Sequence, residues 1–300
     1  MDANEIAFFV AVMDAGSFAN ASRKLGIDRS NISRRIHNIE KEIGAVLLAR
    51  TTRSMRPTEA GEILYERGVA INAQVTEANR AVLSLRSEVR GPLHISCAPL
   101  LWRLHMQKIF WAFCAEHPEV QLSITLRNEV NFTRESVDVA LRVIDDLVDT
   151  VVARQLGHVS WNLCASPAYL RRNGTPKTPQ ELAEHAWLSI RTRPMLEFTR
   201  GIESWRVKPF SRVECGSHSV LHEAALAGLG LGFVPSYATH EDFARRRLVP
   251  LLTGYDVLPT PGTRLYAVTP KSRYVASQVR CLLDFLCEKT SGEPVWQKKG

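Results

Sequence analysis

Apolar residues in the first 43 positions recur with the period of an α-helix, in three blocks separated by glycines. The first apolar face consists of Ile6, Phe9, Val10 and Met13. After Gly16, the second consists of Phe18, Ala21, Ser22 and Leu25. After Gly26, the third consists of Ile32, Ile36, Ile39 and Ile43. Asp2, Ser17 and Asp28 stand where N-cap residues are expected. The pattern predicts three short helices, the last two joined by a tight turn.

The polar face of the third helix carries hydrogen-bonding side chains near its start: Arg29, Ser30, Asn31, Ser33, Arg34 and, a turn later, Asn38. Arginine can pair with guanine, asparagine with adenine, and serine with phosphates or base edges. Two helices joined by a tight turn, with such a face on the second, are typical of a DNA-binding helix-turn-helix. A three-helix fragment of another all-α domain would have no reason for this bias.

Two short extended segments follow, on either side of a basic tip, and predict a β-wing. Arg50, Arg53 and Arg56 can reach phosphates or the narrow minor groove. With Ser17 at the start of the second helix, they complete the predicted DNA-contacting set. The first domain is therefore expected to be a winged helix-turn-helix over residues 1–60.

A continuous helical pattern runs from Thr58 to about Val89. Its apolar residues alternate at spacings of three, four and seven, at Leu64, Ile71, Val75, Ala78, Val82, Leu85 and Val89. This is the a/d seam of a coiled coil, and an isolated helix cannot bury it. We expect a linker helix over residues 58–89 that pairs with a second copy; the alternative is packing against its own chain.

From Arg90-Gly-Pro92 onward, short apolar strands alternate with helices, which predicts α/β architecture with mainly parallel sheets. The expected strands are Leu93–Cys97, Val120–Leu126, Val137–Val143, Val159–Ala165, Gly230–Val234 and Arg264–Val268. The expected helices are Trp102–Glu116, Ser217–Gly228 and Arg273–Lys289. The predicted fold is thus α plus α/β.

Positive charge is concentrated in the predicted DNA-binding segment. Between Ala21 and Pro57 there are nine Lys/Arg and three Asp/Glu, whereas the rest of the chain has 29 basic and 28 acidic residues. A solvated basic face would give a similar count, but this concentration also fits binding to the phosphate backbone. The first residues lack the features of a secretory signal, so we expect a cytoplasmic protein without membrane contact.

Several motifs resemble those of the LysR-type transcriptional regulators, in order and spacing. In the first domain they are Gly16-Ser-Phe18, Ala21-Ser-Arg-Lys-Leu25, Ile32-Ser-Arg-Arg-Ile36, Ile39-Glu40, Glu42-Ile-Gly44, Leu47-Leu48-x-Arg50 and Thr58-Glu-Ala-Gly61. Looser motifs follow, at Val137-Asp-Val-Ala-Leu-Arg142, Val152-Ala-Arg-x-Leu-Gly157, Ser166-Pro-Ala-Tyr-Leu170 and Ala224-Ala-Leu-Ala-Gly228. Ser22, Leu48 and Pro57 depart from the usual residues without threatening the fold.

The resemblance implies a sequence-specific transcription regulator rather than an enzyme. Its partners would be double-stranded promoter DNA, a small-molecule effector, RNA polymerase and further copies of itself, as a homodimer or homotetramer. It also implies that residues 91–300 form a domain like a periplasmic binding protein. The first subdomain would be 91–160 and 268–300, the second 161–267, with the effector in the cleft between them.

Candidate effector-binding residues follow from the rule that ligands bind beyond the carboxyl ends of strands, beside helix N-termini. They are Pro99, Leu100, Leu101, Arg127, Asn128, Val143, Ser217, His218 and Phe233. Arg127 and the helix N-termini would favour an organic acid, whereas the apolar Pro99–Trp102 segment would favour an aromatic ligand. The alternative for each residue is ordinary interior packing.

Signatures of catalysis and metal binding are weak. No G-x-S-x-G or P-loop occurs, and His218 and His222, four residues apart, lack the H-E-x-x-H arrangement. Six scattered cysteines form no C-x-x-C pair, so no metal or cofactor is expected; Cys281 and Cys287 leave a redox role open. A transport-type binding protein would explain only the last two hundred residues, and an enzyme would need a catalytic constellation that the sequence lacks.

Overall fold

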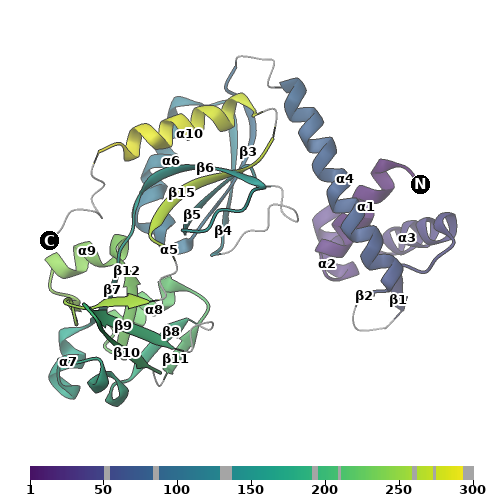
Figure 1. The fold of residues 1–300 in the computed structure, drawn as a ribbon. Helices are drawn as coiled ribbons and strands as arrows, with labels where there is room; N and C mark the ends of the chain where they lie inside the picture. Colours follow the sequence, from purple (N-terminus) through teal and green to yellow (C-terminus); the bar gives the residue numbers. More distant parts are fainter. Residues whose placement is uncertain are drawn as a thin grey trace. The chain divides into compact units, whose positions relative to one another are not determined.

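The computed structural model describes residues 1–50, 55–83, 88–128, 137–190, 195–208, 211–258, 262–272 and 275–292. The chain divides into two compact units, one consisting mainly of Met1–Arg86 and the other of the residues that follow. Each unit has its own secondary structure and its own buried core (Figure 1).

The first unit begins with three helices, α1 (Ala3–Asp14), α2 (Phe18–Leu25) and α3 (Arg29–Ile43). Asp2 caps α1 by accepting hydrogen bonds from the amides of Asn4 and Glu5, and Ser17 caps α2 by accepting one from Asn20. The predicted cap Asp28 makes no such bond. Gly26 and Gly44 follow α2 and α3 with φ of 65° and 78°, a left-handed conformation that favours glycine.

The apolar stripes of these helices form one core. Phe9, Ala21, Ile32 and Ile39 are fully or almost fully buried in it. Ile43, predicted for the same stripe, is 40% exposed because it lies at the last residue of α3, beyond the core. On α1, Phe8 and Val12 are buried in addition to the predicted Phe9 and Val10. The first helix is therefore covered on more than one side.

A two-stranded wing follows, in which β1 (Leu48–Arg50) pairs antiparallel with β2 (Met55–Pro57). The predicted hairpin is present, while its tip, including Arg53, lies outside the described residues. Thr58 ties the wing to the next helix, since its amide donates to the Leu47 carbonyl at 2.9 Å and its hydroxyl to the Val46 carbonyl at 2.6 Å.

The linker helix α4 (Glu59–Leu83) packs against α1 (Figure 1). Val75 is 49% exposed and Ala78 is exposed, so among the described residues this part of the apolar seam remains largely open to solvent. The helix was predicted to reach Val89, but residues 88–90 are not helical. At Gly91 the chain enters a sheet, where the Gly91 amide donates to the Glu119 carbonyl at 3.0 Å.

The second unit contains two subdomains. The sheet of the first has the strand order β4-β3-β5-β15-β6. Its strands are β3 (Gly91–Cys97), β4 (Val120–Leu126), β5 (Val139–Ile144), β6 (Val151–His158) and β15 (Arg264–Pro270). The helices α5 (Pro99–Leu101) and α6 (Gln107–Glu116) follow β3, joined by a π-helix (Trp102–Met106), and α10 (Ser277–Thr290) packs against α6. The predicted helix from Trp102 thus starts earlier, at Pro99, a residue suited to a first helical turn.

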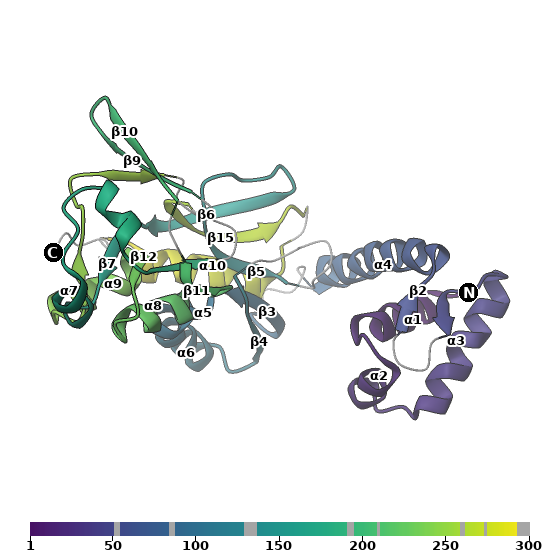
Figure 2. The same ribbon diagram turned by 90° about the horizontal axis from the view of Figure 1, so that it is seen from below.

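The second subdomain contains a sheet of order β11-β8-β12-β7-β13 and a three-stranded antiparallel sheet, β10-β9-β14. The first sheet contains β7 (Trp161–Ala165), β8 (Trp187–Ile190), β11 (Ser211–Cys215), β12 (Leu231–Pro235) and β13 (Val249–Pro250). The other contains β9 (Leu196–Arg200), β10 (Glu203–Val207) and β14 (Asp256–Leu258), with the β9–β10 hairpin prominent in Figure 2. Its helices are α7 (Pro167–Asn173), a 3-10 helix (Gln180–Glu184), α8 (His218–Leu226) and α9 (Ser236–Ala244).

Two expectations about this unit need correction. The sheets are mixed rather than mainly parallel: β15 pairs antiparallel with β5 and β6, and β7 pairs antiparallel with β12 and β13. In addition, β15 joins the first subdomain from Arg264, so the return to that subdomain precedes the expected boundary at residue 268. The first sheet is mixed because β15 returns to it antiparallel to both β5 and β6.

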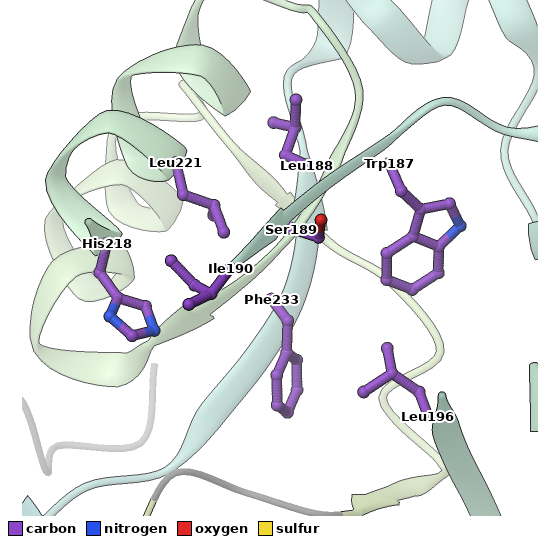
Figure 3. Close-up of a pocket in the computed structure, with 8 residues that line it drawn as sticks. All are labelled: Trp187, Leu188, Ser189, Ile190, Leu196, His218, Leu221 and Phe233. Carbon is purple, nitrogen blue, oxygen red and sulfur yellow. The ribbon is translucent and has the colours of Figure 1, made fainter. Parts of the chain in front are cut away.

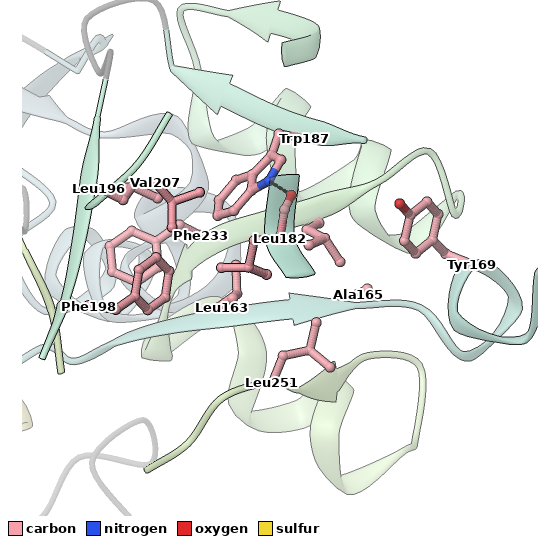
Figure 4. Close-up of a cluster of buried hydrophobic side chains, with 11 residues drawn as sticks. Leu163, Ala165, Tyr169, Leu182, Trp187, Leu196, Phe198, Val207, Phe233 and Leu251 are labelled. Carbon is pink, nitrogen blue, oxygen red and sulfur yellow. Dashed lines mark hydrogen bonds between the residues drawn. The ribbon is translucent and has the colours of Figure 1, made fainter. Parts of the chain in front are cut away.

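Tight packing in the second subdomain explains its run of glycines. A Cβ on Gly230 would lie 2.4 Å from the Ala186 carbonyl oxygen, and one on Gly232 would lie 2.9 Å from the Leu221 side chain. The buried cluster shown in Figure 4 joins both sheets through residues such as Leu163, Trp187, Phe198 and Phe233. These close approaches hold α8 against β12 and β8.

Candidate nucleic-acid interface and effector pocket

The predicted reading face of α3 is open to solvent. Arg29, Ser30, Asn31, Ser33 and Arg34 are all exposed, whereas Ile32 and Ile36 on the opposite face are 0% and 3% exposed. The helix therefore presents its arginine, serine and asparagine side chains outward while its isoleucines anchor it in the core. Such a helix can approach a DNA groove without unfolding.

One hydrogen bond preorganises this face. The Nη2 of Arg34 donates to the Oδ1 of Asn31 at 2.9 Å, one turn earlier on the helix. The bond uses only one of the five guanidinium N–H groups, so the others can still donate to phosphates or bases. The asparagine also retains its NH₂ group as a donor.

The neighbouring Arg35 has a different environment. Its Nε lies 3.1 Å from both carboxylate oxygens of Glu5, and its guanidinium lies 4.1 Å from the centre of the Phe8 ring. An ion pair and a cation–π contact hold this side chain against α1. Arg35 therefore stabilises the three-helix head, whereas Arg34, like Arg29, is exposed on the reading face and available to a partner.

The remaining predicted DNA contacts have more varied surroundings. The hydroxyl oxygen of Ser17 accepts from the Asn20 amide at 3.1 Å, at the start of α2. Arg56 is exposed on β2. The backbone of Arg50 lies in β1, but its side chain, like the whole of Arg53, lies outside what is described.

An apolar pocket lies in the second subdomain (Figure 3). It contains about 370 Å³ of empty space, part of it open to solvent, and is lined by Trp187, Leu188, Ser189, Ile190, Leu196, His218, Leu221 and Phe233. The elements β8, β9, α8 and β12 supply these residues. Of the predicted effector residues, His218 and Phe233 are among them.

The other predicted effector residues lie outside this pocket. Leu100 and Leu101 are 1% and 0% exposed in α5, which also contains Pro99 and packs against α8 and α9. Arg127 is exposed after β4, and Val143 is half-buried in β5. Ser217 caps α8 by accepting a hydrogen bond from the Ser219 amide. Each of these assignments stays a prediction.

Asn128 links the two subdomains close to the pocket. Its Nδ2 donates to the Gly216 carbonyl at 2.7 Å, two residues before His218. In a second link, the Nε2 of His105 lies 2.7 Å from the backbone carbonyl oxygen of Tyr237. Burial lowers the pKa of His105, which favours the neutral ring. Movement at the start of α8 can therefore reach the first subdomain directly.

A buried polar cluster ties α8 to α9. The Nε2 of His222 lies 2.5 Å from Asp242 Oδ2, and an Nη2 of Arg247 lies 2.6 Å from Asp242 Oδ1. His222 and Asp242 are 5% and 1% exposed, so their interaction is little screened by water. His222 thus has a structural partner in Asp242.

Of the six cysteines, Cys97 and Cys164 are buried and the other four are partly buried. All six are free thiols. Burial raises the pKa of Cys97 to about 12 and also raises the pKa of Cys114, Cys164 and Cys281. Cys281 lies 3.3 Å from the Nε2 of His117. A raised pKa disfavours the reactive thiolate, and no metal-binding group of three or more His, Cys, Asp or Glu residues occurs in the described part of the chain.

The sequence contains a signal for one of the pocket walls. Trp187-Leu-Ser-Ile190 is a short apolar run typical of a buried strand. This run forms β8, and Ile190 lies at its carboxyl end, where ligands are expected to bind. Leu196 and Leu221 are brought in by tertiary packing alone.

The fold and its exposed recognition helix define a DNA-binding regulator with an attached ligand-binding-type domain. Family models match both parts: the bacterial regulatory helix-turn-helix protein of the lysR family at residues 3–62, and the LysR substrate binding domain at residues 86–291. The chain therefore belongs to the LysR-type transcriptional regulators, a family of regulators rather than enzymes.

Sequence similarity to known regulators extends over nearly the full length of this chain. An HTH-type transcriptional regulator of Xanthomonas campestris pv. campestris is 32% identical, covering 95% of this chain and 84% of the relative. The probable HTH-type transcriptional regulator LtrA of Klebsiella pneumoniae is 27% identical over 95% of this chain and 93% of its own. The solved structure of CrgA, a LysR-type regulator of Neisseria meningitidis, matches with a TM-score of 0.61 and 26% identity, covering 97% and 100% of the two chains. No described helix is long and apolar enough to cross a bilayer.

Proposed function

We propose that this protein acts as a homodimer that reads two half-sites of a promoter through the exposed face of α3, under the control of a small molecule bound by the second unit. The observation that supports DNA reading most directly is the separation of polar and apolar side chains onto opposite faces of α3. Its outward side chains are donors suited to bases and phosphates, while its inward ones are buried isoleucines. The wing adds Arg56, and Ser17 adds a hydroxyl at the start of α2.

The proposal is tested by the affinity of the protein for DNA upstream of its own gene. We expect fluorescence anisotropy at near-physiological salt to find one duplex that binds about a thousandfold more tightly than a shuffled duplex of the same composition. Raising the salt concentration should weaken both, because counterions return to the phosphates. Equal affinity for all duplexes would contradict sequence-specific regulation.

Pairing through α4 is the second part of the proposal. Val75 is half-exposed on the apolar seam, and a second copy would remove it from water. Replacing Val75 with Asp would place a carboxylate in the paired seam. We expect the apparent dimer dissociation constant, measured by sedimentation equilibrium, to rise by at least about tenfold, since an unpaired buried charge is costly.

Gln74→Asp is the matched control for that prediction. It introduces the same side chain at the neighbouring exposed position, off the seam. The control should stay dimeric, and both variants should keep wild-type helix content by circular dichroism. Dimerisation unaffected by Val75→Asp would place the contact elsewhere.

A further inference from the structure

One residue near the end of α3, Glu40, binds the backbone that leads from the reading helix to the wing (Figure 1). Its main-chain carbonyl accepts hydrogen bonds from the amides of Gly44 at 2.8 Å and Ala45 at 3.2 Å. Its side-chain Oε1 accepts from the amides of Leu47 at 2.8 Å and Leu48 at 3.2 Å. Glu40 therefore holds four of the five amides between residues 44 and 48.

Helix formation alone does not favour a carboxylate at this position. Glu40 lies in the last turn of α3, which ends at Ile43, and the negative end of a helix dipole disfavours an anion there. The side chain is only 12% exposed, and its second oxygen lies 3.9 Å from Nδ1 of His37. A carboxylate removed from water is costly unless hydrogen-bond donors satisfy it. The amides of Leu47 and Leu48 are such donors, so the connection to the wing explains this residue.

The two leucines that donate to Glu40 form the root of the wing. Leu47 and Leu48 are 1% and 5% exposed, so their backbone is anchored in the core of the first unit. Leu48 begins β1, and the next residue, Ala49, lies opposite Arg56 of β2. The position of the exposed Arg56 therefore depends on where the root of the wing is held.

The wing is attached to two helices. Thr58 donates to the carbonyls of Val46 and Leu47 and leads directly into α4. Glu40 supplies the corresponding attachment to α3. A helix in the major groove and a wing beside it can contact one duplex together only if their separation matches that of the groove and the neighbouring phosphates.

We propose that Glu40 is a positioning residue for DNA binding, which holds the wing at the distance from α3 that lets Arg56 and the reading face contact one duplex together. This inference rests on the proposed DNA-binding function and adds to it a residue that acts through the wing. The side chain acts as a hydrogen-bond acceptor of the right length. Its length and its acceptor oxygen are therefore essential, whereas its negative charge is not.

Two substitutions separate the length of this side chain from its charge. Glu40→Asp keeps the charge but is one methylene shorter, whereas Glu40→Gln keeps the length and an acceptor oxygen but removes the charge. We expect anisotropy titrations of the preferred upstream duplex to show about tenfold weaker binding for Glu40→Asp, and an affinity within about twofold of wild type for Glu40→Gln. The reverse order would show that charge rather than position matters and would overturn the inference.

A double-mutant cycle tests whether Glu40 acts through the wing. Arg56→Ala should weaken binding about tenfold in the wild-type and Glu40→Gln backgrounds, but less than about twofold in the Glu40→Asp background, where the wing is already displaced. Arg34→Ala, on α3 itself, should have the same effect in all three backgrounds. Equal effects of Arg56→Ala in all three would contradict action through the wing.

Glu42→Asp is the matched control for Glu40→Asp. It makes the same change two residues later, at an exposed side chain that pairs with the N-terminal ammonium group. Affinity and the effect of Arg56→Ala should both stay at their wild-type values. Every variant should also keep wild-type helix content by circular dichroism. Loss of helix content in Glu40→Asp would assign the residue to the fold of the head and would also contradict a positioning role.

The wild-type titrations separate this inference from the proposed function. Equal binding of the wild type to all duplexes would reject the proposed function together with the inference that rests on it. A normal duplex preference in the wild type, with an effect of Arg56→Ala that does not depend on residue 40, would reject the inference and leave the DNA-binding function in place.

Discussion

Gly61→Ala is expected to destabilise the DNA-binding unit by about 3 kcal/mol, a large fraction of the stability of an ordinary domain. A Cβ at this position would lie 2.1 Å from the backbone carbonyl oxygen of Leu47. Neither the first turn of α4 nor the segment entering β1 can rotate out of the way as a side chain can. Relief of the clash would also loosen the two hydrogen bonds from Thr58 to Val46 and Leu47.

Urea unfolding, followed by circular dichroism, measures the effect, and Gly68→Ala supplies the control. Both glycines lie in α4, so both substitutions gain about 1 kcal/mol of helix propensity. The new methyl group at position 68 would meet side-chain atoms of Val10 and Ile6 at 2.7 and 2.8 Å, while the nearest backbone atom, the Ile6 carbonyl oxygen, lies at an ordinary contact distance of 3.9 Å. Because side chains can adjust, the change there should stay within about 1 kcal/mol. Equal unfolding midpoints for the two variants would show that the wing can move away from α4 at little cost.

The same glycine illustrates what the sequence could and could not predict. The helical periodicity, the capping residues and the Thr58-Glu-Ala-Gly61 motif predicted the winged helix-turn-helix. The prediction succeeded there because the residues that form the local helical pattern are also the residues buried in the core. The reason for Gly61 is a close approach between α4 and β1, which no local pattern contains. Likewise, the helical pattern of α3 does not reveal that Arg35 pairs with Glu5 and lies over the Phe8 ring, because these contacts depend on packing against α1.

The second unit was less predictable because its contacts are mostly long-range. The strand Val120–Leu126 was predicted with the bounds observed, since its apolar residues alternate regularly with polar ones. Short strands such as β8 and β13 were missed, and strand direction depends on where the chain crosses between subdomains. The pocket combines residues from four elements, so the sequence could indicate His218 and Phe233 without their neighbours.

Arg34→Ala is expected to cause the largest loss of function. Arg34 is exposed on the reading face and is oriented by Asn31, and its truncation removes a charged, multidentate donor. Each such contact contributes about 1–3 kcal/mol to DNA binding, and a dimer would lose two, or about 2–6 kcal/mol. The fold should be unaffected, because Arg34 is exposed on the outer face of α3.

Arg171→Ala is the matched control, since it removes an equally exposed arginine from α7 of the second unit. Anisotropy titrations of the preferred upstream duplex with wild type, Arg34→Ala and Arg171→Ala test most directly whether α3 reads DNA. The account predicts at least about thirtyfold weaker binding for Arg34→Ala and wild-type affinity for Arg171→Ala. Wild-type affinity for Arg34→Ala, in a folded dimer, would contradict it.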